Sequence, residues 1–416
     1  MEIKADAGDY VSIKLAKREV KGTILESYDK DIILVKLESG YNIGIPKENV
    51  FDVKVIRKYK GEKVKYDIPS GKGKPKIGLI VTGGTIASKL DARTGGVRAL
   101  TDVEEFAKFY PKLFEKYDIK INSPFMELSE NMNSSHWKTI SKEVKKMLDD
   151  KQVRGIIITH GSDTLHYTSS ILSFFLRGLN KPVALTFSQR SIDRGSSDAE
   201  LNLECAAQFV LSNCAEVVIV GHATENDNYC YALRGTKVRK MHTSRRDTFK
   251  AINCKPIAKI GEKVEFLEEY NARKEGNEKL ELDDKFSNKV ALVKFYPGMD
   301  SGILNYYKNE GYKGLVLEMT GLGHVSSDWI GKIKACIKSG MFICASAQTI
   351  NGSLNPKVYS TGREIEKSGV IYLKDMLSET AFVKLGWVLG HRNWNGKEKE
   401  KMLENFAGEF SEFLSE

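Results

Sequence analysis

Two short apolar runs in this chain end in similar polar turns. Residues 77–81 (Ile-Gly-Leu-Ile-Val) contain no polar side chain, a pattern that predicts a strand buried on both faces of a sheet. The run ends at Thr82-Gly-Gly-Thr85, where two glycines allow the backbone to turn sharply. A second run, residues 153–159, ends at His160-Gly-Ser-Asp-Thr164. Each strand therefore delivers hydroxyl groups to the carboxyl end of the predicted sheet, where open α/β sheets bind ligands.

Strand and helix patterns alternate from residue 76 onward, which predicts an α/β fold built on parallel sheets. In the first part, strands are expected at 77–81, 154–159, 182–187 and 216–221, and helices at 102–116, 136–150, 163–178 and 198–213. In the second part, strands are expected at 290–294, 314–319, 341–345 and 370–373, and helices at 300–310 and 326–338. The chain between the two parts is charged and poor in large apolar side chains, which predicts a linker over residues 271–288.

The two ends of the chain carry other patterns. Residues 1–66 contain short β-rich runs, which predict a small β-barrel with a docking or structural role; they lie at 10–15, 21–25, 31–37 and 42–46. Residues 67–75 contain Pro, Gly and Ser, so a linker is expected there, followed by α/β domains over 76–270 and 289–416. Four apolar side chains near the C-terminus recur at helical spacing and predict an amphipathic helix that packs on the core: Met402, Phe406, Phe410 and Phe413.

Composition narrows the class of protein. The chain has 416 residues, of which 41% are hydrophobic, and no apolar run approaches the roughly 20 residues that span a bilayer. The first residues lack the apolar stretch of a signal peptide, and the six cysteines form no Cys-x-x-Cys pair. A soluble cytoplasmic protein without structural zinc is therefore expected. The net charge of +9 is modest and does not by itself imply nucleic-acid binding.

The polar turns hold the elements of nucleophilic catalysis. A threonine or serine hydroxyl is a weak nucleophile and needs a base beside it. A lysine with a lowered pKa can serve as that base, and Lys237 and Lys240 are the candidates in the stretch from Gly235 to Thr243. Together with Ser162 and Asp163, such a lysine would form a nucleophile, base and orienter without a histidine. The alternative is that both turns are ordinary sharp turns in which Thr and Ser cap helices.

A resemblance favours the catalytic interpretation. Thr82-Gly-Gly-Thr-Ile-Ala87 and His160-Gly-Ser-Asp-Thr164 resemble the two signatures of the asparaginase/glutaminase family, and the likeness extends over about residues 76–390. It implies amide hydrolysis through an acyl-enzyme formed on one hydroxyl. The residues to which it assigns catalysis are Thr85, Ser162, Asp163 and Lys240, and those to which it assigns substrate binding are Ser129, Glu130 and Asp163. Two positions depart from the family pattern: Ser162 replaces a threonine, and no tyrosine occurs between Ser88 and Leu100.

A narrower resemblance concerns the family of D subunits of archaeal glutamyl-tRNA(Gln) amidotransferases. It rests on the small N-terminal β unit and on three stretches: Gly40–Gly44, Ser129–Met132 and Lys237–Arg246. It implies that this chain releases ammonia from glutamine and binds no cofactor. ATP and magnesium would belong to an E-type partner subunit, which would also bind most of Glu-tRNA(Gln). The absence of a Gly-x-x-x-x-Gly-Lys-[Ser/Thr] phosphate loop agrees with this division. The resemblance also implies a dimer of this chain within a heterotetramer.

Two other functions remain open at this point. A free-standing L-asparaginase would share the chemistry and would need no partner. A non-catalytic amino-acid-binding module could retain the same fold without turnover, and the two departures from the family pattern favour it. Five basic side chains could line a path to the partner or to tRNA, or could belong to an exposed loop: Arg234, Lys237, Arg239, Arg245 and Arg246.

Overall fold

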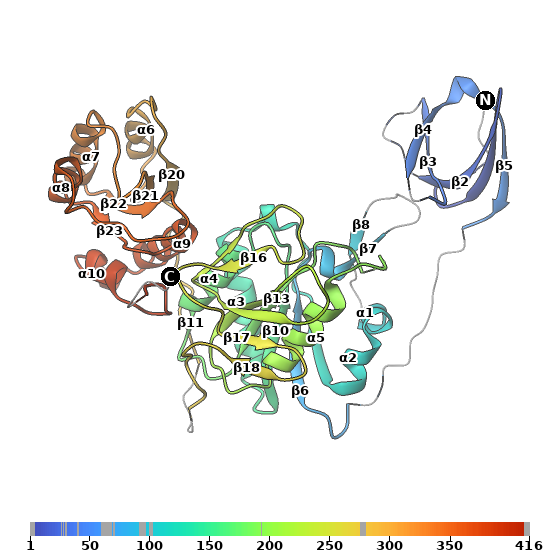
Figure 1. Cartoon of the computed structure of the whole chain (residues 1–416), viewed down its shortest axis with the longest axis horizontal. Helices are drawn as coiled ribbons and strands as arrows, with labels where there is room; N and C mark the ends of the chain where they lie inside the picture. The colour runs from blue at the N-terminus through green and yellow to red at the C-terminus, as the bar shows by residue number, and fades with distance from the viewer. Residues whose placement is uncertain are drawn as a thin grey trace.

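The N-terminal unit is a curved antiparallel sheet. The computed structural model describes residues 5–411 except 26, 28, 30, 40, 60–68, 70, 91–96, 100–102, 193 and 275–279. Parts of both expected linkers (67, 68, 70 and 275–279) and Phe413 thus lie outside the described residues. Five strands form the sheet in the order β4-β3-β2-β1-β5 (Figure 1): β1 (Tyr10–Leu15), β2 (Glu19–Leu25), β3 (Ile32–Lys36), β4 (Asn42–Pro46) and β5 (Val50–Arg57). Four strands were predicted; β5 was not, because Asp52, Lys54 and Arg57 interrupt its apolar residues and most of the strand is exposed.

The central sheet has eight strands in the order β18-β17-β14-β13-β12-β10-β6-β9. Five are parallel: β6 (Lys76–Val81), β9 (Asp118–Asn122), β10 (Val153–Thr159), β12 (Val183–Thr186) and β13 (Val217–His222). Three at one edge are antiparallel: β14 (Cys230–Arg234), β17 (Ala258–Ile260) and β18 (Val264–Phe266). The sheet is therefore mixed rather than wholly parallel. The predicted α/β class is confirmed, and β6 and β10 pair directly, so the two polar turns lie at the same sheet edge.

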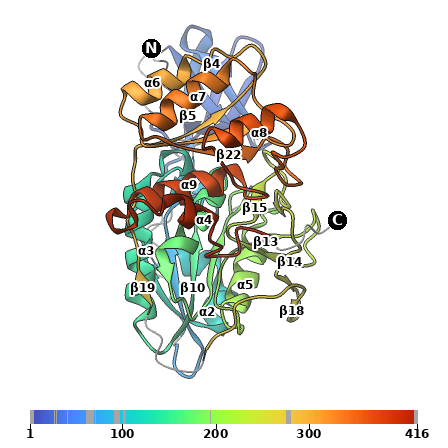
Figure 2. The ribbon, with the colours of Figure 1, turned by 90° about the vertical axis from the view of Figure 1, so that its left-hand side faces the viewer.

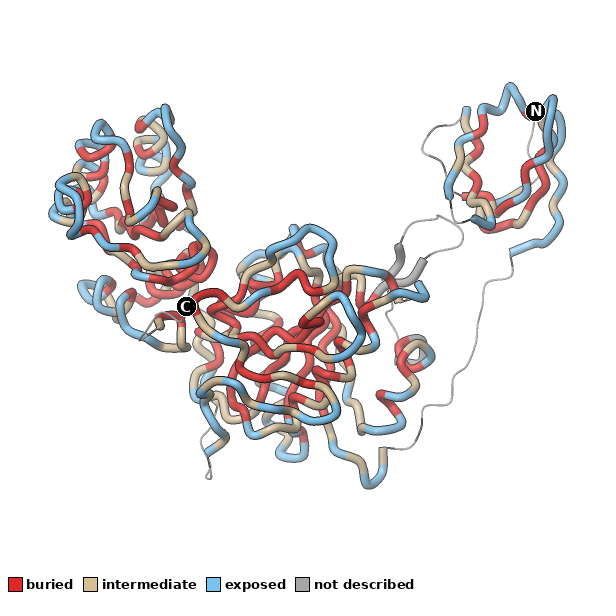
Figure 3. Tube along the Cα trace, viewed as in Figure 1, coloured by how far each residue is buried: buried red, intermediate tan, exposed pale blue. Residues whose placement is uncertain are grey.

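Helices cover both faces of this sheet. One face packs against α1 (Val103–Phe109), α2 (Pro111–Lys116) and α5 (Ala199–Phe209), and the other against α3 (Ser134–Leu148) and α4 (Leu165–Phe175). Residues of the central strands are almost all buried between these layers (Figure 3). The single helix predicted at 102–116 is broken into α1 and α2, because Pro111 cannot continue a helix and instead opens the next one.

The C-terminal unit is a four-stranded parallel sheet in the order β20-β21-β22-β23: β20 (Val290–Lys294), β21 (Gly314–Met319), β22 (Phe342–Ala347) and β23 (Ile371–Tyr372). One face carries α6 (Ile303–Asn309), α7 (Trp329–Lys338) and α8 (Ser360–Lys367). The other face carries α9 (Ser378–Leu389), which also packs against α4 of the central unit (Figure 2). The two α/β units thus share one apolar core around α9. Within the described residues, no helix has the length and apolarity needed to cross a membrane.

The C-terminal amphipathic helix was predicted wrongly, but the prediction that its apolar side chains pack on the core is confirmed for Met402, Phe406 and Phe410. The last helix, α10 (Glu398–Leu403), ends because Glu404 is extended, and Gly408 beyond it adopts a positive φ of 70°. Phe406 and Phe410 therefore lie in an irregular segment, yet both pack on the core around α9. The helical spacing of these apolar side chains indicated that they are buried, but it could not show that the backbone leaves the helix after Leu403.

A buried ion pair fastens this irregular segment. Lys384 in α9 and Glu409 are both 0% exposed, and Lys384 Nζ lies 2.6 Å from Glu409 Oε1. Lys384 also donates to the carbonyl oxygens of Met402 and Glu404, and Glu409 accepts from the backbone amides of Phe406 and Ala407. Burial lowers the pKa of the Lys384 ammonium, and the Glu409 carboxylate opposes that shift.

Removing one partner of this pair should destabilise the protein strongly. Lys384→Met leaves a carboxylate buried without its cation, which is expected to lower the free energy of unfolding by about 3–5 kcal/mol. Guanidinium chloride unfolding measures this change. The control is Lys334→Met, because Lys334 pairs with Glu364 at the surface and such pairs contribute about 0–1 kcal/mol. A Lys384→Met protein as stable as the Lys334→Met protein would contradict the assignment.

Candidate active site

The two polar turns touch each other through their glycines. Gly84 has a φ of 81°, and a Cβ atom built there would lie 2.6 Å from the backbone of His160 and Gly161. Thr82 donates from its backbone amide and its hydroxyl to the Thr159 carbonyl, at 3.2 and 2.7 Å. No other residue permits both this backbone conformation and this approach. The glycine at position 84 therefore holds the two hydroxyl-bearing loops together.

A third segment, residues 127–129, closes against the same loops. A Cβ atom on Gly83 would collide with the Glu127 carbonyl, and one on Gly161 would lie 2.8 Å from Ser129 Cβ. The Glu127 amide donates to the Thr82 carbonyl at 3.0 Å, so this segment continues the edge of the sheet. The three loops that carry Thr85, Ser129 and Ser162 therefore meet at one place.

Ser162, Asp163 and Lys240 form a hydrogen-bonded triad. Lys240 Nζ lies 2.9 Å from Ser162 Oγ and 2.6 Å from Asp163 Oδ1. The Lys240 side chain is 10% exposed and the Asp163 side chain 68% exposed. The lysine therefore contacts the turn from the protein interior, and the carboxylate faces solvent. The arrangement places a nitrogen base within direct proton-transfer distance of a hydroxyl, which is the contact that nucleophilic catalysis requires.

Lys240 lies on a short strand, whereas Lys237 forms an ion pair away from the triad. The stretch from Gly235 to Thr243 contains β15 (Val238–Lys240), which pairs with β16 (Phe249–Ala251). Lys237, at 1% exposure, forms a buried ion pair with Asp375 of the C-terminal unit. The structure therefore brings Lys240, and not Lys237, to Ser162 and Asp163.

The remaining predicted residues lie around this triad. Thr85 opens the 3-10 turn η2 (Thr85–Ala87) and is half-buried, and Tyr110 in the break between α1 and α2 donates to the Ile86 carbonyl at 2.8 Å. Ser129 is buried in the 3-10 turn η3 (Ser129–Asn131), and Thr164 donates to its carbonyl oxygen at 2.6 Å. Glu130 follows on the exposed side of that turn. Within the described residues, Lys240 bonds to Ser162 and Asp163 and not to Thr85.

His160 is a site residue that the sequence analysis did not identify. Burial lowers its pKa to about 4, so the imidazole is neutral at physiological pH. Trp137 Nε1 donates to Thr168 Oγ1, which in turn lies 3.0 Å from His160 Nε2, and His160 Nδ1 lies 2.7 Å from the Gly161 carbonyl. A neutral ring protonated at Nδ1 satisfies all three contacts. Its position at the start of the His-Gly-Ser-Asp-Thr motif was the one feature of the sequence that could have drawn attention to it.

The five basic side chains considered for tRNA contact are paired inside the protein. Each has an acidic partner: Arg234 with Glu216, Lys237 with Asp375, Arg239 with Glu379, Arg245 with Asp247 and Arg246 with Asp227. These pairs hold loops and strands together.

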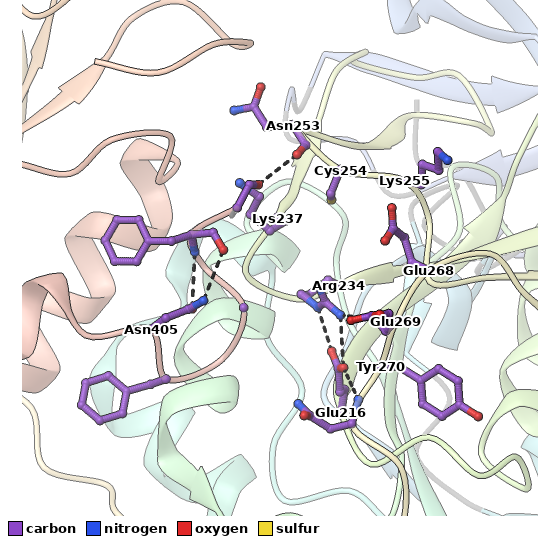
Figure 4. A pocket seen from close by; sticks show the side chains of 15 residues that line it. Glu216, Arg234, Lys237, Asn253, Cys254, Lys255, Glu268, Glu269, Tyr270 and Asn405 are labelled. Carbon is purple, nitrogen blue, oxygen red and sulfur yellow. Dashed lines mark hydrogen bonds and ion pairs between the residues drawn. The ribbon is translucent and has the colours of Figure 1, made fainter. Parts of the chain in front are cut away.

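A cavity of about 650 Å³ lies near this hairpin but apart from the triad (Figure 4). Loops of the central unit line one side, with the Glu216–Arg234 pair and Lys255, and the segment 405–411 lines the other. Lys237 lines it, but none of the residues to which the resemblance assigns catalysis or substrate binding does.

Comparison with known proteins adds independent information. The sequence matches three families: Asparaginase, N-terminal, over residues 76–272; Glutaminase/Asparaginase C-terminal domain, over 289–403; and GatD N-terminal domain, over 5–56. It is 46% identical to the D subunit of the glutamyl-tRNA(Gln) amidotransferase of Pyrococcus furiosus, covering 98% of this chain and 95% of that one. It is 39% identical to the protein of the same name from Methanococcus maripaludis, covering 99% of each chain.

Solved structures share the α/β part. The thermostable L-asparaginase from Thermococcus kodakarensis superposes with a TM-score of 0.72 at 28% identity, covering 81% of this chain and 99% of that one. L-asparaginase I from Vibrio cholerae superposes with a TM-score of 0.71 at 23% identity, covering 82% of this chain and all of that one. These asparaginases are thus matched nearly whole, while part of this chain has no counterpart in them.

Proposed function

The chain belongs to the family of D subunits of glutamyl-tRNA(Gln) amidotransferases, and on this premise we propose how its site works as the glutaminase of the complex. The observation that carries the proposal is the contact of Lys240 with Ser162 and Asp163, on a turn that abuts the Thr85 loop. The chain hydrolyses glutamine to glutamate and ammonia. The ammonia serves to convert Glu-tRNA(Gln) to Gln-tRNA(Gln) on the partner subunit.

The chemistry runs through an acyl-enzyme. The Thr85 oxygen attacks the side-chain amide carbon of glutamine, and its proton passes to the Ser162–Lys240 pair. The same pair returns a proton to the departing nitrogen, so ammonia leaves and a glutamyl ester remains on Thr85. Water then cleaves the ester, which regenerates the hydroxyl and releases glutamate. Backbone amides of the glycine turns would stabilise each oxyanion, an effect worth about 100- to 1000-fold in kcat per donor.

Substrate recognition falls to groups around the turn. The Asp163 carboxylate is exposed and negatively charged, so it can bind the α-ammonium of glutamine while its other oxygen contacts Lys240. Ser129 and Glu130, on the turn against Gly161, would contact the α-amino and α-carboxylate ends. The neutral His160 holds the Gly161 carbonyl and so fixes the turn that carries Ser162.

The division of labour with the partner follows the family. ATP, magnesium and most contacts to tRNA are assigned to an E-type partner subunit, and this chain is assigned no cofactor. The internal pairing of Arg234, Lys237, Arg239, Arg245 and Arg246 supports placing tRNA on the partner. We assign the N-terminal sheet to docking, and we expect two copies of this chain in a heterotetramer.

Substrate preference separates this function from its rivals. Ammonia release from glutamine and from asparagine is measured with the purified chain, with and without the E-type partner and charged tRNA. Glutamine turnover that rises with the partner is expected. Asparagine turnover indifferent to the partner would mean a free-standing asparaginase, and binding of either amino acid without turnover would mean a binding module. Neither rival explains a match to a GatD N-terminal domain over residues 5–56.

A further inference from the structure

The strand that carries Lys240 is too small to hold its own position. β15 has three residues, and within the part of the chain that the structure describes it pairs with β16 alone, which also has three residues. Two-stranded sheets are marginally stable in isolation. The 2.9 Å contact between Lys240 and Ser162 therefore requires support from outside the hairpin.

Part of that support comes from the central unit, where Val238 of β15 and Phe249 of β16 are buried in the core. The other part comes from the C-terminal unit of the same chain. Glu379, in the first turn of α9, contacts Arg239 of β15, with 3.2 Å between Arg239 Nε and Glu379 Oε1. The next residue, Thr380, donates its hydroxyl to the Thr236 carbonyl at 2.9 Å. Asp375, just before α9, pairs with Lys237. Three side chains around the start of α9 thus hold three points of the segment that leads to Lys240. We name Asp375, Glu379 and Thr380 the α9 clamp.

The α9 clamp also reaches the element that carries Ser162. α4 begins directly after the His160–Thr164 turn, and α9 packs along α4. His166, in the first turn of α4, is buried with its Nε2 3.8 Å from Glu379 Oε1. Burial, with Arg239 and Lys240 adding to it, lowers the pKa of His166 to about 3, so its ring is neutral. Glu379 therefore lies between β15, which carries Lys240, and α4, which follows the turn that carries Ser162.

Strand geometry explains how such a contact directs the lysine. Successive side chains of a strand point to opposite faces, so fixing Arg239 toward α9 fixes the direction of Lys240 toward Ser162. Glu379 is 8% exposed, and Arg239 provides the compensating charge that a buried carboxylate needs. Losing that charge would release Arg239 and let the hairpin shift. A misplacement of about 1 Å at a catalytic group can cost about 100-fold in rate.

We propose that Glu379, acting with Arg239, is a positioning residue that sets the approach of Lys240 to Ser162. The C-terminal unit then contributes to catalysis within its own chain through the α9 clamp. The inference rests on the proposed glutaminase function. It assigns Glu379 no contact with glutamine.

The test compares two equally buried carboxylates. Glu379→Gln and Arg239→Met should each lower kcat for glutamine about 10- to 100-fold, with KM changed less than about 3-fold. Because they act as one unit, the double variant should lose no more than the more impaired single variant. The control is Glu216→Gln, which breaks the buried pair with Arg234 at 2.9 Å and should keep kcat within about 2-fold of wild type. Thr380→Val, which keeps the side-chain shape, should lower kcat by a smaller factor.

Several results would overturn the proposal. They are a wild-type kcat in Glu379→Gln, an equal loss of kcat in Glu216→Gln, or additive losses in the double variant. If the wild-type chain itself releases no ammonia from glutamine, the proposed function fails rather than the α9 clamp. In that case a crystal structure of Glu379→Gln decides, and a Lys240–Ser162 distance unchanged from 2.9 Å would overturn the positioning role.

Discussion

Thr85→Ala is expected to abolish glutamine hydrolysis while leaving the fold intact. Thr85 is half-buried on a surface turn after β6, so losing its hydroxyl creates no cavity in the core. It does remove the atom that forms the acyl-enzyme, and removal of a nucleophile lowers kcat by at least about 10⁴-fold. Ammonia release gives the rate, and circular dichroism with the thermal midpoint checks the fold.

The matched variant for this position is Thr85→Ser. Serine keeps the hydroxyl and loses only the methyl group, so it should retain turnover, reduced by the freer rotation of its side chain. A Thr85→Ala protein that turns over glutamine at a rate near that of wild type would mean that Ser162 is the nucleophile.

Lys240→Ala is the second variant with a large expected effect. Its side-chain nitrogen Nζ lies within hydrogen-bond distance of both Ser162 and Asp163, and as a neutral amine it would be the base that the triad provides. Loss of a general acid–base group costs about 100- to 10 000-fold in kcat. Substrate binding should weaken little, because Asp163 and Ser129 remain in place.

A lysine on the paired strand controls for loss of charge. Lys250 lies in β16, is exposed and pairs with Asp247 at 2.7 Å. Lys250→Ala should keep kcat within about 2-fold of wild type, since surface pairs contribute little. Equal losses of kcat in Lys240→Ala and Lys250→Ala would show that catalysis depends on the intact β15–β16 hairpin and not on the Lys240 amine.

The sequence predicted the parts of the site that are local in the chain. Uninterrupted apolar runs identified β6 and β10, and the glycines after them identified the turns, because each signal is contained within about ten residues. The pairing of those strands then placed Thr85 and Ser162 at one edge. The choice of Lys240 over Lys237 came from a family pattern, and composition alone could not have made it.

What the sequence did not predict depends on contacts across long distances in the chain. The α9 helix, Asp375 and Glu379 lie more than a hundred residues from the strand that they hold, so no local pattern links them. His160 was missed because its role depends on Trp137 and Thr168, from two different helices. The segment 404–411 was mistaken for helix because periodicity reports which side chains are buried and not the path of the backbone.

The most direct test of the whole account follows the nitrogen atom. Glutamine labelled with ¹⁵N at its side-chain amide is supplied to this chain together with an E-type subunit, ATP, magnesium and Glu-tRNA(Gln), and the glutamine attached to the tRNA is analysed by mass spectrometry. The label should appear in that glutamine with the wild-type chain and disappear with Thr85→Ala, and added ammonium should restore unlabelled product. Labelled product with Thr85→Ala, or no label with the wild-type chain, would contradict the account.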